Sequence, residues 1–87
     1  MNNAIHLLVV EDERNVGETL SERLQAAGYR VTLADSAARA RQAWRSQTPQ
    51  LALLDVGLPD GNGFALAREL RAAAPQTAII FLTAHGN

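Results

Sequence analysis

The sequence of 87 residues contains no cysteine, which excludes a disulfide framework and any metal site built from thiolates. No apolar run approaches the ~20 residues that a membrane-spanning helix needs. The first residues lack a basic segment followed by a long apolar one, so no signal peptide is predicted and a cytoplasmic location is expected. Eight basic and nine acidic side chains leave a net charge of -1, which argues against a nucleic-acid-binding surface.

What the sequence does contain is typical of one small globular domain. Apolar residues make up 47% of the chain and charged residues 20%. The length permits a single domain, residues 1–87, with little stability in reserve, because a short chain buries a smaller share of its surface than a long one.

Four apolar stretches alternate with three amphipathic ones. The apolar stretches predict strands at 5–10, 29–34, 51–55 and 78–83, and the first of them is also rich in β-branched residues. The helical spacing between them predicts helices over about 13–27, 37–45 and 63–74. This β-α-β-α-β-α-β order predicts an α/β fold with a parallel sheet and right-handed crossovers.

The same spacing predicts which helical residues face the core. The expected apolar stripes are Val16, Leu20, Leu24 and Ala27 in the first helix, Ala37, Ala40 and Trp44 in the second, and Phe64, Ala67, Leu70 and Ala74 in the third. Asp35 or Ser36 is the predicted N-cap of the second helix and Asn62 that of the third. Gly28 is expected to end the first helix.

The fourth apolar stretch is hydrophobic on both faces and is followed by only four residues. A strand of this kind needs cover on both faces, and its outer edge is a template for pairing with another chain. We therefore expect an α/β domain that is incomplete at its C-terminal end or completed by a partner, with self-association through the fourth strand. An unrelated, complete four-stranded fold is the alternative.

Acidic and hydroxyl side chains follow three of the predicted strands. Glu11 and Asp12 follow the first, Asp55 ends the third, and Thr83 ends the fourth. The strands of a parallel sheet end at one edge, so these side chains are expected to converge there. Clustered carboxylates repel one another unless a cation lies among them, and oxygen ligands suit Mg²⁺. The sequence therefore predicts a Mg²⁺ site at this edge.

Asp55 is also a candidate nucleophile. It lies between a buried apolar run and a turn-rich loop, Gly57-Leu58-Pro59-Asp60-Gly61-Asn62-Gly63. A carboxylate beside Mg²⁺ can attack phosphorus and form an acyl phosphate. The hydroxyl of Thr83 could then donate a hydrogen bond to the new phosphoryl group.

Three segments together resemble the receiver domain of two-component response regulators. They are Leu8-Val9-Val10-Glu11-Asp12-Glu13, Leu53-Leu54-Asp55 with the loop that follows it, and Ile80-Phe81-Leu82-Thr83-Ala84. The resemblance implies a flavodoxin-like sheet of order 2-1-3-4-5, of which this chain supplies the first four strands.

The resemblance also implies roles for single residues. Asp55 would be the phosphoacceptor that receives a phosphoryl group from a histidine kinase or a phosphotransfer protein. Asp12 would bind Mg²⁺ directly, Glu11 would act through water or through the direct ligands, and Gly57 would supply its backbone carbonyl. Thr83 would contact the phosphoryl group.

The chain departs from the family pattern in lacking the fifth strand, with the aromatic switch residue on it and the surface that the family uses for dimers. The family's lysine at the end of the fifth strand is missing, and no other lysine occurs in the sequence. Loss of that cation predicts weak phosphorylation and impaired switching. Many family members carry a DNA-binding domain after the receiver, so the resemblance implies that a longer parent protein regulates transcription.

Other functions remain open from the residues alone. A metal-dependent phosphohydrolase with an aspartyl nucleophile is disfavoured by Gly57, which stands where such enzymes commonly place a second acid. A dinucleotide-binding half-domain is disfavoured because no glycine-rich turn follows the first strand. An interaction domain without phosphorylation is the third alternative. The surface expected to contact a kinase is the 56–62 loop together with Arg14, Asn15 and Val16.

Overall fold

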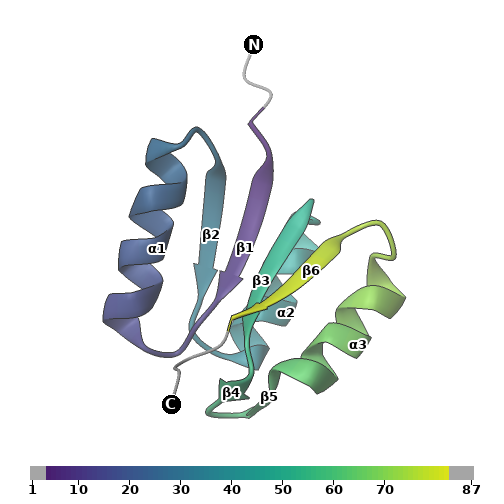
Figure 1. Ribbon diagram of the computed structural model, residues 1–87. Coiled ribbons are helices and arrows are strands. Elements are labelled where there is room, and N and C mark those ends of the chain that lie inside the picture. The colour runs from purple at the N-terminus through teal and green to yellow at the C-terminus, as the bar shows by residue number, and fades with distance from the viewer. Residues whose placement is uncertain (1–3, 83–87) are drawn as a thin grey trace.

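The computed structural model describes residues 4–82, which form a four-stranded parallel sheet with helices on both faces (Figure 1). The chain order is β1 (His6–Val10), α1 (Arg14–Ala26), β2 (Arg30–Ala34), α2 (Ala37–Ser46), β3 (Leu51–Asp55), β4 (Gly57–Leu58), β5 (Gly61–Asn62), α3 (Gly63–Ala73) and β6 (Ala78–Leu82). The sheet has the order β2-β1-β3-β6. The predicted alternation and flavodoxin-like arrangement are confirmed, whereas the two-residue strands β4 and β5, which pair with each other, were not predicted.

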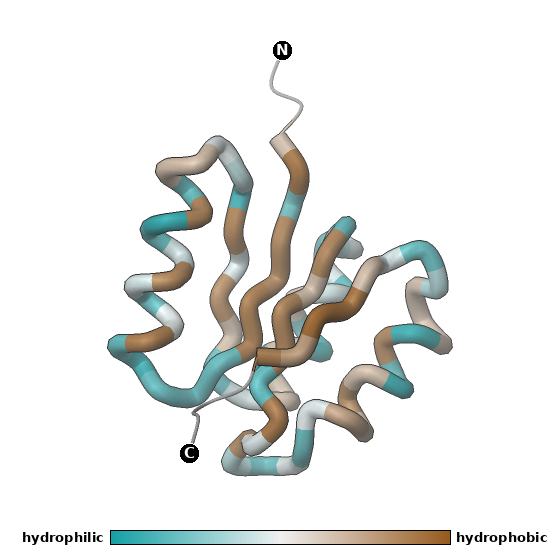
Figure 2. Tube along the Cα trace, viewed as in Figure 1, coloured by the Kyte–Doolittle hydropathy of each residue, from teal (hydrophilic) through white to brown (hydrophobic). Residues whose placement is uncertain are grey.

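The central strands are the most deeply buried part of the sheet. Every residue of β1 is buried, because β1 pairs with β2 on one side and β3 on the other. Figure 2 shows apolar residues concentrated along the strands and hydrophilic residues in the loop that follows β1. The sheet therefore has an apolar interior and a polar edge where its strands end.

Helices α2 and α3 cover one face of the sheet and form the main core with it. Leu8 and Leu54 of the sheet and Leu66 of α3 are at most 1% exposed. Trp44 of α2 joins this cluster, as its helical spacing predicted. Burying a leucine side chain contributes about 2 kcal/mol relative to leaving it in water, so this face supplies much of the stability of the fold.

Helix α1 lies on the opposite face, over β1 and β2, and its predicted apolar stripe is wrong. Val16 is 49% exposed and Ala27 is also exposed, while Leu20 and Leu24 are only half-buried. The buried residues of α1 are instead Gly17 and Ser21. Small side chains lie at this contact because the helix approaches the sheet closely: a Cβ added at Gly17 would lie 3.0 Å from Cδ1 of Leu33.

Helix α3 also departs from its predicted face at one position. Phe64 is 53% exposed, and its place in the core is taken by Leu66. Phe64 lies in the first turn of α3, where it reaches only the side of the sheet. There its ring contacts that of Phe81 of β6, with 4.8 Å between the ring centroids.

The helix ends follow the predicted capping residues. Ser36 caps α2 by accepting a hydrogen bond from the N–H of Arg39, and Asn62 caps α3 by accepting one from Ala65. Gly28 follows the end of α1 with a φ of 103°, a left-handed conformation that glycine adopts without strain. Among residues 4–82, no helix has the length and apolar character needed to cross a bilayer.

Candidate functional site

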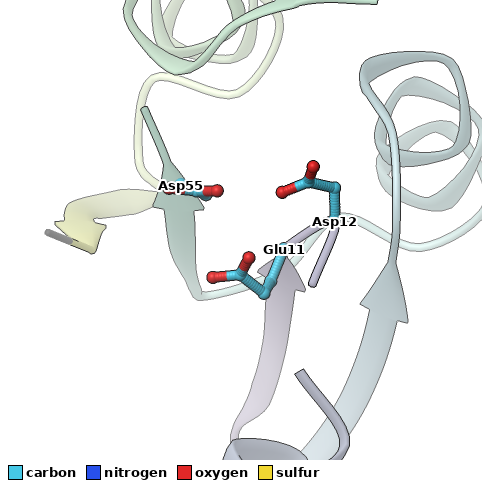
Figure 3. Close-up of side chains that lie close together, drawn as sticks. All are labelled: Glu11, Asp12 and Asp55. Carbon is cyan, nitrogen blue, oxygen red and sulfur yellow. The ribbon is translucent and has the colours of Figure 1, made fainter. Parts of the chain in front are cut away.

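The register of the sheet brings the predicted acidic residues together. Val10 of β1 is paired with Leu54 of β3, so that the next residues along each strand, Glu11 and Asp55, stand at the same level. Asp12 follows at the start of the loop to α1. Figure 3 shows the three carboxylates turned toward one another. One oxygen from each of Glu11, Asp12 and Asp55 lies within 4.8 Å of the others.

Glu11 is the most constrained of the three acids. Its side chain is buried, and its Oε2 accepts a hydrogen bond of 3.0 Å from the N–H of Glu13. Burial raises the pKa of the Glu11 carboxyl, the charges of Asp55 and Asp12 act in the same direction, and the hydrogen bond from Glu13 opposes them. The cluster therefore disfavours three simultaneous negative charges unless a cation is present.

Asp55 and Asp12 differ in their access to water. Asp55 is 4% exposed at the end of β3, whereas Asp12 is exposed at the rim of the site. Glu13 takes no part in the cluster, because its Oε1 caps α1 by accepting hydrogen bonds from the N–H groups of Asn15 and Val16. The cluster thus has a buried floor and one acid that is open to solvent.

The loop after Asp55 is tightly folded against the strand. β4 and β5 pair antiparallel, Gly57 with Asn62 and Leu58 with Gly61. The N–H of Gly63 donates a hydrogen bond of 2.7 Å to the carbonyl of Val56. This close approach requires glycine, because a Cβ on Gly63 would lie 2.2 Å from the carbonyl oxygen of Asp55.

All but one of the predicted site residues lie within the part of the chain that the structure describes. Glu11, Asp12 and Asp55 converge, and Gly57 lies two residues beyond Asp55 in β4. Thr83 lies outside the described residues. Two residues that hold the loop in place were missed: Gly63, whose only signal was its place just before a helix, and Asp60, whose partners lie far away in the sequence.

The donor set fits a hard divalent cation. It consists of carboxylate oxygens alone, two of them largely buried, and one rim position is open for water. Mg²⁺ is usually bound by one or two carboxylates and several waters, so three carboxylates around an accessible position meet its requirements. The pKa of Glu11 is raised first by burial and then by the charges of Asp55 and Asp12, and a cation among the carboxylates would offset that repulsion.

The chain has the parallel sheet of an α/β protein, with carboxylates at the carboxyl ends of adjacent strands, the edge at which such folds bind ligands. Residues 7–87 match the family model of the response regulator receiver domain. The chain therefore belongs to the response regulator receiver family.

Individual relatives agree with this assignment. The chain is 41% identical over 76 residues to the transcriptional regulatory protein CreB of Escherichia coli strain K12, an alignment that covers 87% of this chain and 33% of CreB. Among solved structures, the non-phosphorylated HemR receiver domain of Leptospira biflexa is 40% identical with a TM-score of 0.86, covering 95% of this chain and 67% of that one.

A second solved structure is relevant to the acidic cluster. The response regulator TrrA of Thermotoga maritima, in complex with Mg²⁺ and BeF, is 35% identical with a TM-score of 0.87, covering 94% of this chain and 71% of that one. The chain thus spans about a third of the length of the curated relative CreB and about two thirds of these receiver structures.

Proposed function

We propose that this receiver chain accepts a phosphoryl group on Asp55 in a reaction that requires Mg²⁺ held by Asp12, Asp55 and the backbone carbonyl of Gly57. The observation that carries the proposal is the convergence of Glu11, Asp12 and Asp55 within 4.8 Å at one edge of the sheet. The Mg²⁺ complex of TrrA supports the choice of cation.

The chemistry assigned to Asp55 follows from its position. One carboxylate oxygen bonds to phosphorus while the phosphorus–nitrogen bond of a phosphohistidine on the donor breaks, which leaves histidine on the donor. When bound, Mg²⁺ would neutralise negative charge on the phosphoryl oxygens. Glu11 keeps the floor of the site rigid through its bond to Glu13 and would reach the cation through water. Thr83 is assigned the contact with the phosphoryl group.

Phosphorylation is tested with a small-molecule phosphodonor and Mg²⁺, with intact mass as the readout. We expect a fraction of the wild-type chains to gain the mass of one phosphoryl group, and Asp55→Asn to gain none. Glu22→Gln, which removes an exposed carboxylate on α1, is the matched control and should behave as the wild type. Equal labelling of Asp55→Asn and the wild type would contradict the proposal.

The same assay separates a phosphoacceptor from an enzyme. A receiver takes part in its own phosphotransfer and is not a metabolic enzyme, so we expect the phosphorylated chain to accumulate instead of hydrolysing the phosphodonor over many turnovers. Many turnovers without accumulation of the phosphorylated chain would favour the aspartyl phosphohydrolase alternative. Because the sequence has no lysine, we expect labelling below one phosphoryl group per chain.

The kinase or phosphotransfer protein is assigned to the surface around the start of α1. Val16 is 49% exposed and lines a groove of about 590 Å³ together with Glu11, Glu13, Asn15, Thr19, Leu20, Arg23 and Leu82. This groove begins beside the acidic cluster, so a donor seated in it would have access to Asp55. The 56–62 loop borders the cluster from the side of β3.

The docking assignment is tested by phosphotransfer from an autophosphorylated histidine kinase that labels the wild-type chain. Val16→Ser should slow the transfer while leaving labelling by the small phosphodonor unchanged. Tyr29→Ser removes an exposed apolar side chain at the far end of α1 and is the control. If transfer to Val16→Ser and Tyr29→Ser is equally fast, the kinase docks elsewhere.

Self-association through β6 belongs to the same proposal. Among the described strands β6 pairs only with β3, and Ile80 is 51% exposed on the face beside α1, so a second copy could pair with the other edge of β6 and cover this side chain. Size-exclusion chromatography with light scattering should show a dimer that Ile80→Lys dissociates and Ile5→Lys, at a 43% exposed position before β1, does not. A monomeric wild-type chain would contradict self-association through β6.

The role of the protein in the cell is also part of the proposal. The relatives named transcriptional regulatory proteins support a part in transcriptional control by a longer protein. No nucleic acid or membrane is assigned to this segment, in keeping with its net charge of -1, and a cytoplasmic location goes with the kinase partner.

A further inference from the structure

The loop that follows Asp55 is fastened to a helix distant in the sequence. Asp60, at the tip of the β4–β5 turn, accepts a hydrogen bond of 2.8 Å on Oδ1 from the N–H of Ala37 and one of 3.0 Å on Oδ2 from the N–H of Ala38. The donors are the first two residues of α2 and lie 23 and 22 residues away along the chain. One carboxylate therefore bridges the loop and the helix.

The bridge satisfies groups that α2 cannot satisfy by itself. The first N–H groups of a helix have no partner inside it, and the helix dipole favours negative charge at this end. The local cap Ser36 accepts only from Arg39, at 3.1 Å. The two bonds from Ala37 and Ala38 lower the pKa of the Asp60 carboxyl, so Asp60 is ionised at neutral pH.

The pairing of β4 with β5 connects Asp60 to Gly57. Asp60 lies between Leu58 and Gly61, which are paired with each other, and the next pair joins Gly57 to Asn62. Leu58 is buried in the core, whereas no atom lies within 4 Å of the position that a Cβ on Gly57 would occupy. Gly57 is held through the paired loop, whose base is closed by the bond from Gly63 to Val56 and whose tip is held by Asp60.

We propose that Asp60 is a positioning residue for the cation site: by fastening the β4–β5 turn to the N-terminus of α2, it holds the backbone carbonyl of Gly57 where Mg²⁺ requires it. This inference rests on the proposed function, in which Gly57 is a ligand. The helix that Asp60 contacts is itself held against α3, because Arg41 of α2 donates hydrogen bonds of 2.7 and 2.9 Å to Glu69.

The test compares Mg²⁺ binding by three variants with the wild-type chain, using the amide signal of Gly57 in the NMR spectrum of nitrogen-labelled protein. Asp60→Ala removes both bonds and should raise the Kd for Mg²⁺ about tenfold, the lower range found for groups that support metal ligands. Asp60→Asn keeps one acceptor oxygen and should lie between Asp60→Ala and the wild type.

Ser36→Ala is the matched control. It removes the other side-chain cap of α2 without touching the loop, so it should lower the stability of the fold and leave the Kd for Mg²⁺ unchanged. If the role of Asp60 were only to stabilise α2, Asp60→Ala and Ser36→Ala would change thermal stability alike and neither would change the Kd.

The outcomes separate this inference from the proposed function. Equal Kd values for Asp60→Ala and Ser36→Ala, with Mg²⁺ binding intact, would overturn the positioning role and leave the cation site standing. A wild-type chain that binds no Mg²⁺ would overturn both. If Asp60→Ala does not fold, as judged by circular dichroism, Asp60→Asn against Ser36→Ala decides in the same way.

Discussion

The two faces of the sheet are built differently. On the face covered by α2 and α3, Leu8, Leu54 and Leu66 are at most 1% exposed. On the face that carries α1, Ile80 is 51% exposed and Val16 is 49% exposed, and in residues 4–82 the helix covers only β1 and β2. One face is a packed interior, and the other presents apolar surface next to the acidic cluster.

This difference separates what holds the site from what can bind to it. The packed face fixes β3 and therefore Asp55, and it also anchors Leu58 and the loop that follows. The open face provides the groove along α1, and within residues 4–82 β6 has a strand partner on one side only. The acidic cluster lies at the edge where the two faces meet, so it is held from one side and accessible from the other.

The sharpest test of this contrast truncates one apolar side chain on each face. Leu66→Ala leaves a cavity in the packed core and should lower the free energy of unfolding by about 3 kcal/mol. Ile80→Ala removes a side chain that is already half in water and should cost about 1 kcal/mol or less. Urea denaturation measures both, and equal losses would mean that the two faces are equally packed.

A smaller effect is expected where the loop touches β3. Gly63→Ala places a methyl group against the carbonyl of Asp55 and should lower the free energy of unfolding by about 2 kcal/mol, because backbone atoms must move. Gly57→Ala is the control in the same loop, since no atom lies within 4 Å of the added Cβ. Thermal unfolding measures both. A larger loss of stability for Gly57→Ala than for Gly63→Ala would contradict a close contact between residue 63 and the carbonyl of Asp55.

The smallest effect concerns His6, which is buried at the start of β1, where its Nε2 lies 2.8 Å from Oγ1 of Thr32. Burial lowers the pKa of His6 below 6.5, and the positive charge of Arg30 acts in the same direction. A lowered pKa means that His6 contributes stability that is present above pH 6.5 and is lost as the pH falls through its value in the fold.

We therefore expect the wild-type chain to lose more stability than His6→Leu as the pH falls below 6.5, with Arg30→Gln between them. Chemical denaturation at a series of pH values measures this. Parallel curves for the wild type and His6→Leu would show that another group titrates in this range.

Much of the fold was predictable because local patterns and tertiary packing agree. The apolar runs that became β1 and β3 are buried on both faces, and their common edge was enough to predict that Glu11, Asp12 and Asp55 would meet. The order of the strands followed from the resemblance to receiver domains and from the alternation of strands and helices.

The errors occur where packing depends on partners distant in the sequence. Helical spacing placed Val16 inside because it cannot show that Gly17 and Ser21 are the residues that allow α1 to approach the sheet. Helical spacing also placed Phe64 in the core, because the spacing contains no information on how far the first turn of α3 lies from the centre of the sheet. The bonds from Asp60 to Ala37 and Ala38 have no local signal at all, since they join elements 22 and 23 residues apart.

The most direct measurement of the central claim is the binding of beryllofluoride, a phosphoryl mimic, followed by calorimetry with and without Mg²⁺. If the acidic cluster holds Mg²⁺ beside an Asp55 carboxylate that accepts the phosphoryl group, beryllofluoride will bind the wild-type chain only when Mg²⁺ is present, and Asp55→Asn will abolish binding. Binding without Mg²⁺, or equal binding by Asp55→Asn, would contradict the account.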